Sequence, residues 1–368
     1  MKEKYNYKSI YSIIRDRIIS GEYPNATLLP PETALASEYG VSRPTVAKVY
    51  NRLERERLVE RKKGRGTLVS HVVYDDRSYT FGLLLPGAGE SEIFATINNR
   101  LLSLSKEKEF ECLWDGATAS NAYIRRNLIE TCCSNYIEKH VDGIFFSPLE
   151  RVSDAVRLNI EICERIERAG IPLVLIDRDV VAPPEKSRFD VVGLDNYNAA
   201  TVMARLMIKA GCKNIYFFYR PYTAYSAVMR LRGVRDAVLE AGLYFLKNNV
   251  ICGNPEDMDI VRNISLIKGN TGIVCVNDST AAVLMSSLEA IGYKCGKDYL
   301  LCGFDDMKYS QHLKCALTSY MQPCDEIADV SVELMMRRME NMDRAPLHVL
   351  LNGSVVERES TVFSFKND

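Results

Sequence analysis

Several apolar runs in the sequence end in side chains that donate or accept hydrogen bonds. Asp177 follows the run IPLVLI, Asn277 follows GIVCV, and Asp305 follows LLCGF. Ser147 and Asp115 end the runs GIFF and FECLW in the same way. Carboxylates, amides and hydroxyls together suit a ligand with many hydroxyl groups, because they can hold vicinal hydroxyls in paired hydrogen bonds. The pattern therefore predicts a site for a small sugar.

Two further points bear on this prediction. Asp, Asn and Ser are good helix N-caps, so any one of these residues could simply begin the next helix, and we expect Asp278 to do so. Aromatic rings would pack on the C–H face of a sugar, and Phe94, Trp114, Tyr222 and Tyr225 are the candidates. Trp114 is the only tryptophan, and we expect it in the core because tryptophan is usually well buried.

These positions require a scaffold of alternating strands and helices. Continuous apolar runs such as TFGLLLP, IPLVLID and NIYFFY are typical of strands buried on both faces of a sheet. The helical stretches that separate most of them span 96–108, 121–139, 158–169, 196–210, 225–241, 256–267 and 279–291. The alternation predicts doubly wound α/β structure with parallel sheets, in which ligands bind beyond the carboxyl ends of the strands.

The first seventy residues differ in charge from the rest of the chain. They hold 14 Lys/Arg and 8 Asp/Glu, whereas the remainder holds 33 and 40. A basic segment beside an acidic body favours contact with a polyanion such as nucleic acid. A basic surface that has no partner is the alternative.

Hydrophobic spacing predicts three helices in this basic segment. The first spans 7–20 and carries isoleucines at helical spacing. Gly40 ends the second, and Ser42 is a good N-cap for the third, whose apolar residues between 46 and 53 face inward. Two helices joined by a tight glycine turn form a helix-turn-helix, and the second of them presents its first turn to base edges.

A β-hairpin is predicted after these helices, because LVERKK and TLVS flank a GRG turn. Its tip holds Lys62, Lys63, Arg65 and Gly66. Glycine lets a backbone approach a phosphate or enter a minor groove, and arginine suits the negative potential of a narrow groove. We expect the hairpin to act on DNA, and a module that binds another protein is the alternative.

The segment LLPPETALASEYGVSRPTVAKVYNRLERERLVERKKGRGTLV resembles the winged-helix domain of the GntR family. The resemblance implies DNA contacts from residues 42–45, a phosphate contact from Arg52 or a neighbour, and a wing tip at Gly66 in the minor groove. Ala47 stands where some members place a base-reading arginine, and Lys48 could partly replace that charge. The expected DNA-binding residues are Ser42, Arg43, Thr45, Lys48, Arg52, Lys63, Arg65 and Gly66.

Residues 80–360 resemble the effector domain of the lactose-repressor/galactose-repressor (LacI/GalR) family, which shares the fold of periplasmic sugar-binding proteins. The motifs IPLVLIDRD, RLRGVRDAV, VNDSTAAVLMSSLEAIG, LCGFDDMKYS and LTSYMQP carry the resemblance. The loop that usually reads Asn-Pro-Phe-Phe is Ser91-Glu92-Ile93-Phe94 in this chain, so Phe94 matches and Glu92 does not. The ligand contacts that the resemblance implies are Phe94, Asp177, Arg230, Asn277, Asp305 and Gln322.

Other functional classes are disfavoured by what the sequence lacks. It contains no G-x-x-x-x-G-K or G-x-G-x-x-G loop, no G-x-S-x-G elbow, no C-x-x-C pair and no metal-spaced histidines. We therefore expect no enzyme activity, no cofactor and no metal site. The N-terminus is charged throughout, and no stretch approaches the ~20 apolar residues that span a membrane. We expect a cytoplasmic protein with reduced cysteines rather than a secreted transport-binding protein.

The two resemblances together describe the arrangement of arabinose-type repressors. We expect a winged helix-turn-helix domain over 1–70, a linker over 71–79, and a two-lobed ligand-binding and dimerisation domain over 80–368. The predicted protein is a homodimeric repressor of a carbohydrate-utilisation operon that binds a palindromic operator and is modulated by an arabinose- or fucose-like sugar. A sugar-binding protein, or a regulator that responds to a non-sugar metabolite, is the alternative.

Overall fold

The structure is a computed structural model, and it describes residues 5–19, 21–24, 27–55, 58–62, 65–70, 78–86, 92–114 and 122–363. Internal contacts divide the chain into two units, Met1–Ser78 and Tyr79–Asp368. Residues 71–77 of the expected linker lie outside the described residues, as do Lys63 and Asp115.

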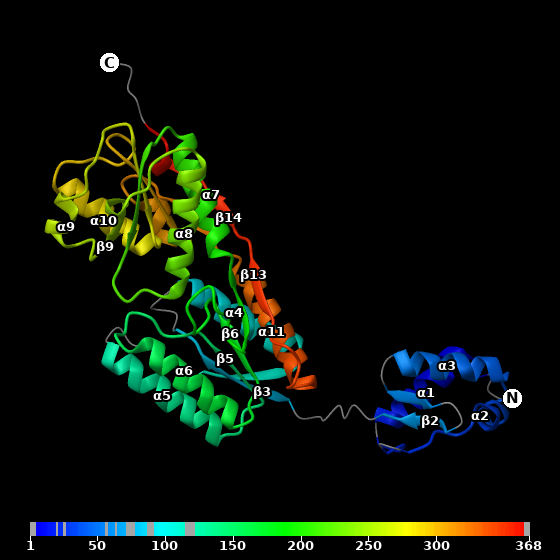
Figure 1. Ribbon diagram of the computed structural model, residues 1–368. Helices are drawn as coiled ribbons and strands as arrows, with labels where there is room; N and C mark the ends of the chain where they lie inside the picture. Colours follow the sequence, from blue (N-terminus) through cyan, green and yellow to red (C-terminus); the bar gives the residue numbers. More distant parts are fainter. Residues whose placement is uncertain are drawn as a thin grey trace. The chain divides into compact units, whose positions relative to one another are not determined.

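The smaller unit is a three-helix core with a two-stranded wing (Figure 1). Its elements are α1 (Tyr7–Ile19), α2 (Glu32–Tyr39), α3 (Arg43–Arg55), β1 (Val59–Lys62) and β2 (Gly66–Val69). The two strands pair antiparallel, as the hairpin prediction requires. The predicted inner faces of the helices are buried, including Leu35 on α2 and Val46, Val49 and Leu53 on α3. The helix-turn-helix and its wing are therefore confirmed.

The larger unit contains two six-stranded sheets. The first has the strand order β13-β7-β6-β5-β3-β4 and is parallel throughout. The second has the order β14-β12-β11-β10-β8-β9, and its edge strand β14 runs antiparallel to β12. The strands are β3 (Tyr79–Leu84), β4 (Phe110–Leu113), β5 (Gly143–Phe146), β6 (Leu173–Ile176), β7 (Asp190–Leu194), β8 (Asn214–Tyr219), β9 (Val250–Cys252), β10 (Thr271–Cys275), β11 (Leu300–Phe304), β12 (Thr318–Met321), β13 (His348–Leu351) and β14 (Ser354–Val356).

Helices cover both faces of each sheet, which makes two lobes (Figure 1). In the first lobe α4 and α11 pack on one face, and α5 and α6 pack on the other. In the second lobe α7 and α8 cover one face, and α9 and α10 cover the other. The helices are α4 (Glu92–Glu107), α5 (Ala122–Glu138), α6 (Ala155–Arg168), α7 (Asn196–Lys209), α8 (Tyr225–Glu240), α9 (Met258–Arg262), α10 (Asp278–Ala290) and α11 (Cys324–Glu340), with short 3-10 turns at Lys247–Asn249, Lys308–His312 and Glu359–Thr361. The predicted doubly wound α/β class is confirmed.

The chain crosses between the lobes three times, each time in one or two residues. It passes from β7 to α7 at Asp195, from β12 to α11 at Gln322 and Pro323, and from β13 to β14 at Asn352 and Gly353. Helix α11 and strand β13 thus belong to the first lobe although most of the second lobe precedes them. A side chain on Gly353 would collide with the carbonyl oxygen of Met321, so the second and third crossings lie against each other.

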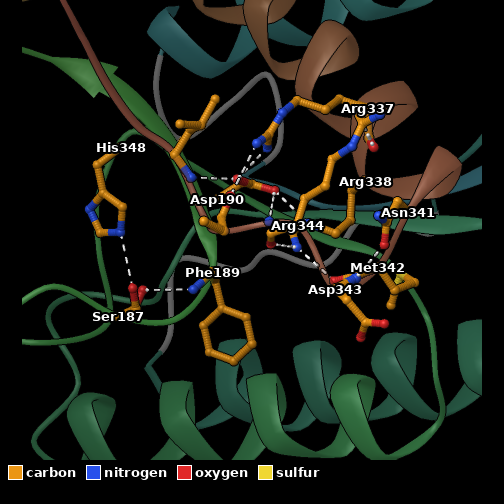
Figure 2. A network of polar contacts seen from close by, with 12 residues as sticks. Ser187, Phe189, Asp190, Arg337, Arg338, Asn341, Met342, Asp343, Arg344 and His348 are labelled. Carbon is orange, nitrogen blue, oxygen red and sulfur yellow. Dashed lines mark hydrogen bonds and ion pairs between the residues drawn. The ribbon is translucent and has the colours of Figure 1, made fainter.

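The returning segment is fixed to the first lobe by a buried ion pair (Figure 2). Asp190 at the start of β7 accepts a hydrogen bond from Arg338 Nε of α11 at 2.8 Å, and from the backbone N–H of Leu347 at 2.7 Å. The Asp190 side chain is fully buried and that of Arg338 is 10% exposed. Because Asp190 holds both the end of α11 and the entry to β13, this contact sets the register of the edge strand.

Candidate DNA-binding surface and ligand cleft

The predicted recognition helix begins with an ordered, exposed first turn. Gly40 adopts φ 65° and donates its N–H to Ala36, a left-handed conformation that favours glycine. The backbone N–H of Thr45 then donates to the carbonyl oxygen of Ser42 at 2.9 Å, and the two hydroxyl oxygens are 2.8 Å apart. Ser42 and Arg43 are exposed and Thr45 is half-buried. The first turn of α3 therefore offers a hydroxyl pair and a guanidinium to a groove of DNA.

Glu32 connects the recognition helix to the wing. One of its carboxylate oxygens accepts from Arg43 Nε at 3.0 Å, and the other accepts from Arg61 on β1. The Arg61 guanidinium also donates to Asn51 of α3. The Glu32 carboxylate is 14% exposed, whereas the Arg43 side chain is 70% exposed. Glu32 thus orients an arginine that remains accessible to a base edge.

The other predicted contacts on α3 lie along an open depression. This depression is lined by Tyr7, Ser42, Pro44, Thr45, Lys48, Asn51 and Arg52. The Arg52 guanidinium lies 3.8 Å from the centre of the Tyr11 ring, a cation–π contact that fixes its direction. Lys48 and Arg52 are both exposed, as a phosphate contact requires.

The described part of the wing carries Arg65 and Gly66, and both are exposed. Gly66 has φ 96°, which a residue with a side chain rarely adopts. Lys62 forms an ion pair with Glu60 at 3.0 Å on the same strand. The wing therefore presents cations without bulk, as predicted for a hairpin tip that approaches phosphates.

A cavity of about 410 Å³ lies between the two lobes of the larger unit. All six predicted ligand residues line it: Phe94, Asp177, Arg230, Asn277, Asp305 and Gln322. Five of the six lie at or just beyond the carboxyl ends of strands or at the first turn of α4, and Arg230 reaches the cavity from the second turn of α8. The topology therefore brings together residues from 94 to 322 that are far apart in the sequence.

The first-lobe wall carries a chain of charges. The Asp177 carboxylate accepts from Arg178 Nε at 2.7 Å, and the Arg178 Nη1 atom is 3.0 Å from Glu150 Oε2. Burial would raise the pKa of Glu150, but the positive charges of Arg178 and Arg151 outweigh it and lower that pKa. Asp177 has φ 75°, a left-handed conformation that residues with side chains rarely adopt and that tends to occur at functional sites.

The second-lobe wall holds Arg230, which is 6% exposed. Its Nε donates to Asn196 Oδ1 at 2.7 Å, its Nη1 donates to the carbonyl oxygen of Val276, and its guanidinium lies 4.2 Å from the centre of the Phe304 ring. Burial lowers the pKa of Arg230, while the charge of Asp305 opposes that shift. Arg230 is therefore a buried, oriented cation and not an exposed residue of the helix surface.

Asp305 and Gln322 meet at the base of the cavity. Gln322 Nε2 donates to Asp305 Oδ1 at 2.7 Å, and burial raises the pKa of Asp305 although Arg230 opposes that shift. Gln322 Oε1 and Ser147 Oγ are both buried, and neither has a hydrogen-bond partner among the described residues. Buried polar atoms are nearly always paired. Two such atoms in one cavity wall indicate a ligand with hydroxyl or amide groups.

Asn277 and Asp278 have exchanged the roles that the sequence suggested. Asn277 is the N-cap of α10, and its side chain accepts from the N–H of Thr280 at 2.9 Å. Asp278 is fully buried behind the cavity and accepts from Ser310 Oγ at 2.8 Å and from Ser319 Oγ at 2.7 Å. The expectation that Asp278 caps the helix is wrong, because its carboxylate is taken up by the loop and strand behind it.

Of the four candidate aromatic platforms, Phe94 alone lines the cavity. Trp114 is 42% exposed, so its expected place in the core is wrong. Tyr222 and Tyr225 line a smaller neighbouring cavity of about 110 Å³. Sequence reasoning did not identify Glu150 or Arg125 as lining residues, because Glu150 comes three residues after its strand and Arg125 lies on a helix without a motif.

Comparisons with known families divide the chain in the same way as its structure. Residues 6–69 match the bacterial regulatory proteins of the gntR family, and residues 204–361 match the periplasmic binding protein-like domain. The arabinose metabolism transcriptional repressor of Halalkalibacterium halodurans is 24% identical, and the alignment covers 98% of this chain and 97% of that protein. In the described residues, no helix is long and apolar enough to cross a membrane.

Other relatives match the larger unit. The transcriptional repressor PurR of Vibrio atlanticus is 28% identical over 61% of this chain, and the regulator CelR of Thermobifida fusca is 24% identical over 60% of it. These alignments span 65% and 64% of the two relatives. Among solved structures, the CelR–cellobiose complex has a TM-score of 0.63 at 19% identity and covers 90% of this chain and 100% of that one, and CcpA of Lactococcus lactis has 0.64 at 22% and covers 77% and 99%.

Proposed function

Because this chain joins a gntR-family regulatory domain to a periplasmic binding protein-like domain, we propose that it is a sequence-specific DNA-binding repressor controlled by a small sugar. The observation that carries the proposal is the pairing, in one chain, of an exposed recognition helix with a cleft whose wall holds two unpartnered buried oxygens. The whole-length similarity to an arabinose metabolism repressor supports it. The effector of this chain would be arabinose- or fucose-like.

The cleft favours an uncharged polyhydroxyl compound. Arg178 is neutralised by Asp177 and Glu150, and Arg230 lies near Asp305, so no inner cation is left over for an anionic ligand. Carboxylates, an amide and a guanidinium remain to bind vicinal hydroxyls. Phe94 offers an apolar face to a sugar ring. The proposed ligand residues are the six that the sequence predicted.

The proposed regulator is a cytoplasmic homodimer without enzymatic activity. Its domains would be 1–70 and 80–368, joined by a linker over 71–79. A two-fold symmetric dimer matches a palindromic operator, and closure of the lobes on a sugar would change the spacing of the two winged helices. The ligand shifts DNA affinity only by binding one arrangement more tightly than the other.

The test is a thermal-shift screen of the full-length protein. L-arabinose, D-fucose, D-ribose, D-galactose and cellobiose are compared with gluconate and glucose 6-phosphate as anionic controls. A ligand that binds only the folded state raises the melting temperature. We expect a neutral sugar to raise it and to change the protein's affinity for an operator selected from random duplexes. Stabilisation by the anionic compounds alone would contradict the proposed effector class, and failure to select any duplex would contradict the DNA-binding function.

A further inference from the structure

The two lobes are joined across the cleft by hydrogen bonds as well as by the three crossings. The backbone N–H of Ala224 donates to Glu150 Oε2 at 3.3 Å, and the N–H of Arg151 donates to the carbonyl oxygen of Tyr222 at 2.8 Å. At a separate place the N–H of Lys308 donates to Glu92 Oε2 at 2.8 Å. First-lobe carboxylates thus accept backbone N–H groups of the second lobe at two points.

Glu150 differs from the other cross-cleft carboxylate because it is connected to the cavity. Its Oε2 atom, which faces Ala224, is also 3.0 Å from Arg178 Nη1. Arg178 holds Asp177 Oδ2 with Nε at 2.7 Å and with Nη2 at 2.6 Å. An unbroken chain of charged contacts therefore runs from Asp177 in the cavity wall to the backbone of the second lobe.

Glu150 also supplies something that α8 lacks. The N-cap of this helix is Ala224, which has no side-chain oxygen to accept from the first turn. A carboxylate at a helix N-terminus is stabilised by the unsatisfied N–H groups and the helix dipole. Here the carboxylate comes from the other lobe, and α8 is the helix that carries Arg230. The acceptor is present only when the lobes are closed.

The backbone on both sides is shaped for this contact. Arg151 has φ 59° and Tyr222 has φ 56°, and these two residues are hydrogen-bonded to each other. Left-handed conformations of residues with side chains cost free energy and persist where the surroundings hold them. The opposing positive charges of Arg178 and Arg151 keep Glu150 ionised, as its lowered pKa indicates.

We propose that Glu150 is a latch that holds the lobes closed, and that Arg178 is a positioning residue that couples this latch to Asp177. The role of Asp177 as a ligand residue rests on the proposed function. A ligand hydroxyl bound to Asp177 would fix Asp177, and hence Arg178 and Glu150, in the geometry that accepts the N–H of Ala224. Ligand binding would then favour the closed lobes by stabilising one arrangement over the other.

The test is hydrogen–deuterium exchange on the full-length protein without ligand, followed in peptides that cover residues 222–227. We expect Glu150→Ala to accelerate exchange there roughly three- to tenfold, as loss of a hydrogen bond allows local opening. Glu150→Gln should give a smaller increase, because its amide oxygen still accepts but no longer pairs with Arg178. Arg178→Met should also accelerate exchange at 222–227, although no hydrogen bond or ion pair printed for its described side chain reaches the second lobe.

The matched control is Glu92→Ala, which removes the other cross-cleft carboxylate. It should accelerate exchange near residue 308 and leave 222–227 unchanged, and in all variants peptides from β10 should stay protected if the fold is intact. Parental exchange at 222–227 in Glu150→Ala would overturn the latch, and parental exchange in Arg178→Met alone would overturn the coupling. Because no ligand is added, either result is independent of whether a sugar is the effector.

Discussion

Gln322 Nε2 donates to Asp305 Oδ1 at 2.7 Å, which ties one of the crossings between the lobes to the carboxylate at the end of β11. The other side-chain atom of Gln322, its Oε1, is buried and unpartnered among the described residues. A ligand that donates a hydroxyl to Gln322 would therefore act on a segment through which the chain passes from one lobe to the other. The residues that bind and the residues that bend are adjacent in this protein.

The recognition helix gives the first prediction. Arg43→Ala should abolish specific binding to a selected operator, because a bidentate arginine contact contributes about 1–3 kcal/mol of base discrimination. Gel-shift titration of full-length protein measures it. Arg205→Ala, which removes an exposed arginine of α7 paired with Glu240, is the control and should bind as the parent does. Parental affinity in Arg43→Ala would show that α3 does not read the operator.

The wing should act through charge alone. Replacing Lys62, Lys63 and Arg65 together with alanine should weaken binding to every duplex, of whatever sequence. The slope of log affinity against log salt should become shallower by up to about 0.9 for each lost phosphate contact. Titrations of a random-sequence duplex over a range of salt concentrations measure the slope. An unchanged slope would remove the wing from the interface.

Arg230 combines a binding and a structural role. Arg230→Ala should abolish the response to the sugar that stabilises the parent protein. It should also lower the free energy of unfolding by about 1.5–3 kcal/mol, because Asn196 and the carbonyl oxygen of Val276 lose a charged donor. Calorimetry and urea denaturation measure the two effects separately. DNA binding of the folded variant should match the parent, and undiminished sugar affinity would place Arg230 outside the binding site.

The buried pair of Asp190 and Arg338 should carry a large share of the stability of the first lobe. Arg338→Met leaves a fully buried carboxylate without its cation and should cost about 3–5 kcal/mol in urea denaturation. The double variant Asp190→Asn, Arg338→Met should recover part of that loss. Arg205→Met breaks a pair whose side chains are 63% and 60% exposed, and should cost only about 0–1 kcal/mol. Equal costs for the two single variants would refute the argument from burial.

Asp278 should make stability depend on pH. Burial, reinforced by the charge of Asp305, raises its pKa from 3.8 to about 7. Between these values the folded protein keeps a proton that the unfolded chain releases, so this group makes folding less favourable as pH rises. Asp278→Asn does not titrate, and its unfolding free energy relative to the parent should therefore increase from about pH 4 to about pH 7. A pH-independent difference between the two proteins would contradict the raised pKa.

Local patterns in the sequence were sufficient for most of the fold. Isoleucines and valines at helical spacing predicted the buried faces of α1 and α3, and apolar runs such as NIYFFY predicted the central strands. The ligand residues were reached because parallel strands bring their carboxyl ends to one edge, so Asp177 and Asp305 had to be near neighbours of the cleft. Chemistry and topology agree at these positions.

The features that were missed depend on contacts far apart in the sequence. Helix α11 and strands β12 to β14 were not predicted, since their place in one lobe or the other is decided by partners more than a hundred residues away, such as Asp190 for Arg338. Trp114 is exposed because β4 is an edge strand and its end has no covering helix among the described residues. Glu150 was not identified because its significance lies in an N–H of the other lobe.

The three short crossings have a consequence for synthesis of the chain on the ribosome. The first lobe lacks α11 and its edge strand β13 until residue 351 has been made, although its other strands are complete by residue 194. During this interval its apolar face toward α11, which includes Phe145, Val174 and Val192, has no cover from that helix. Exposed apolar surface of this kind is prone to aggregation and attracts chaperones. We therefore expect truncation before residue 351 to yield insoluble protein, and neither lobe to be expressible as one continuous fragment.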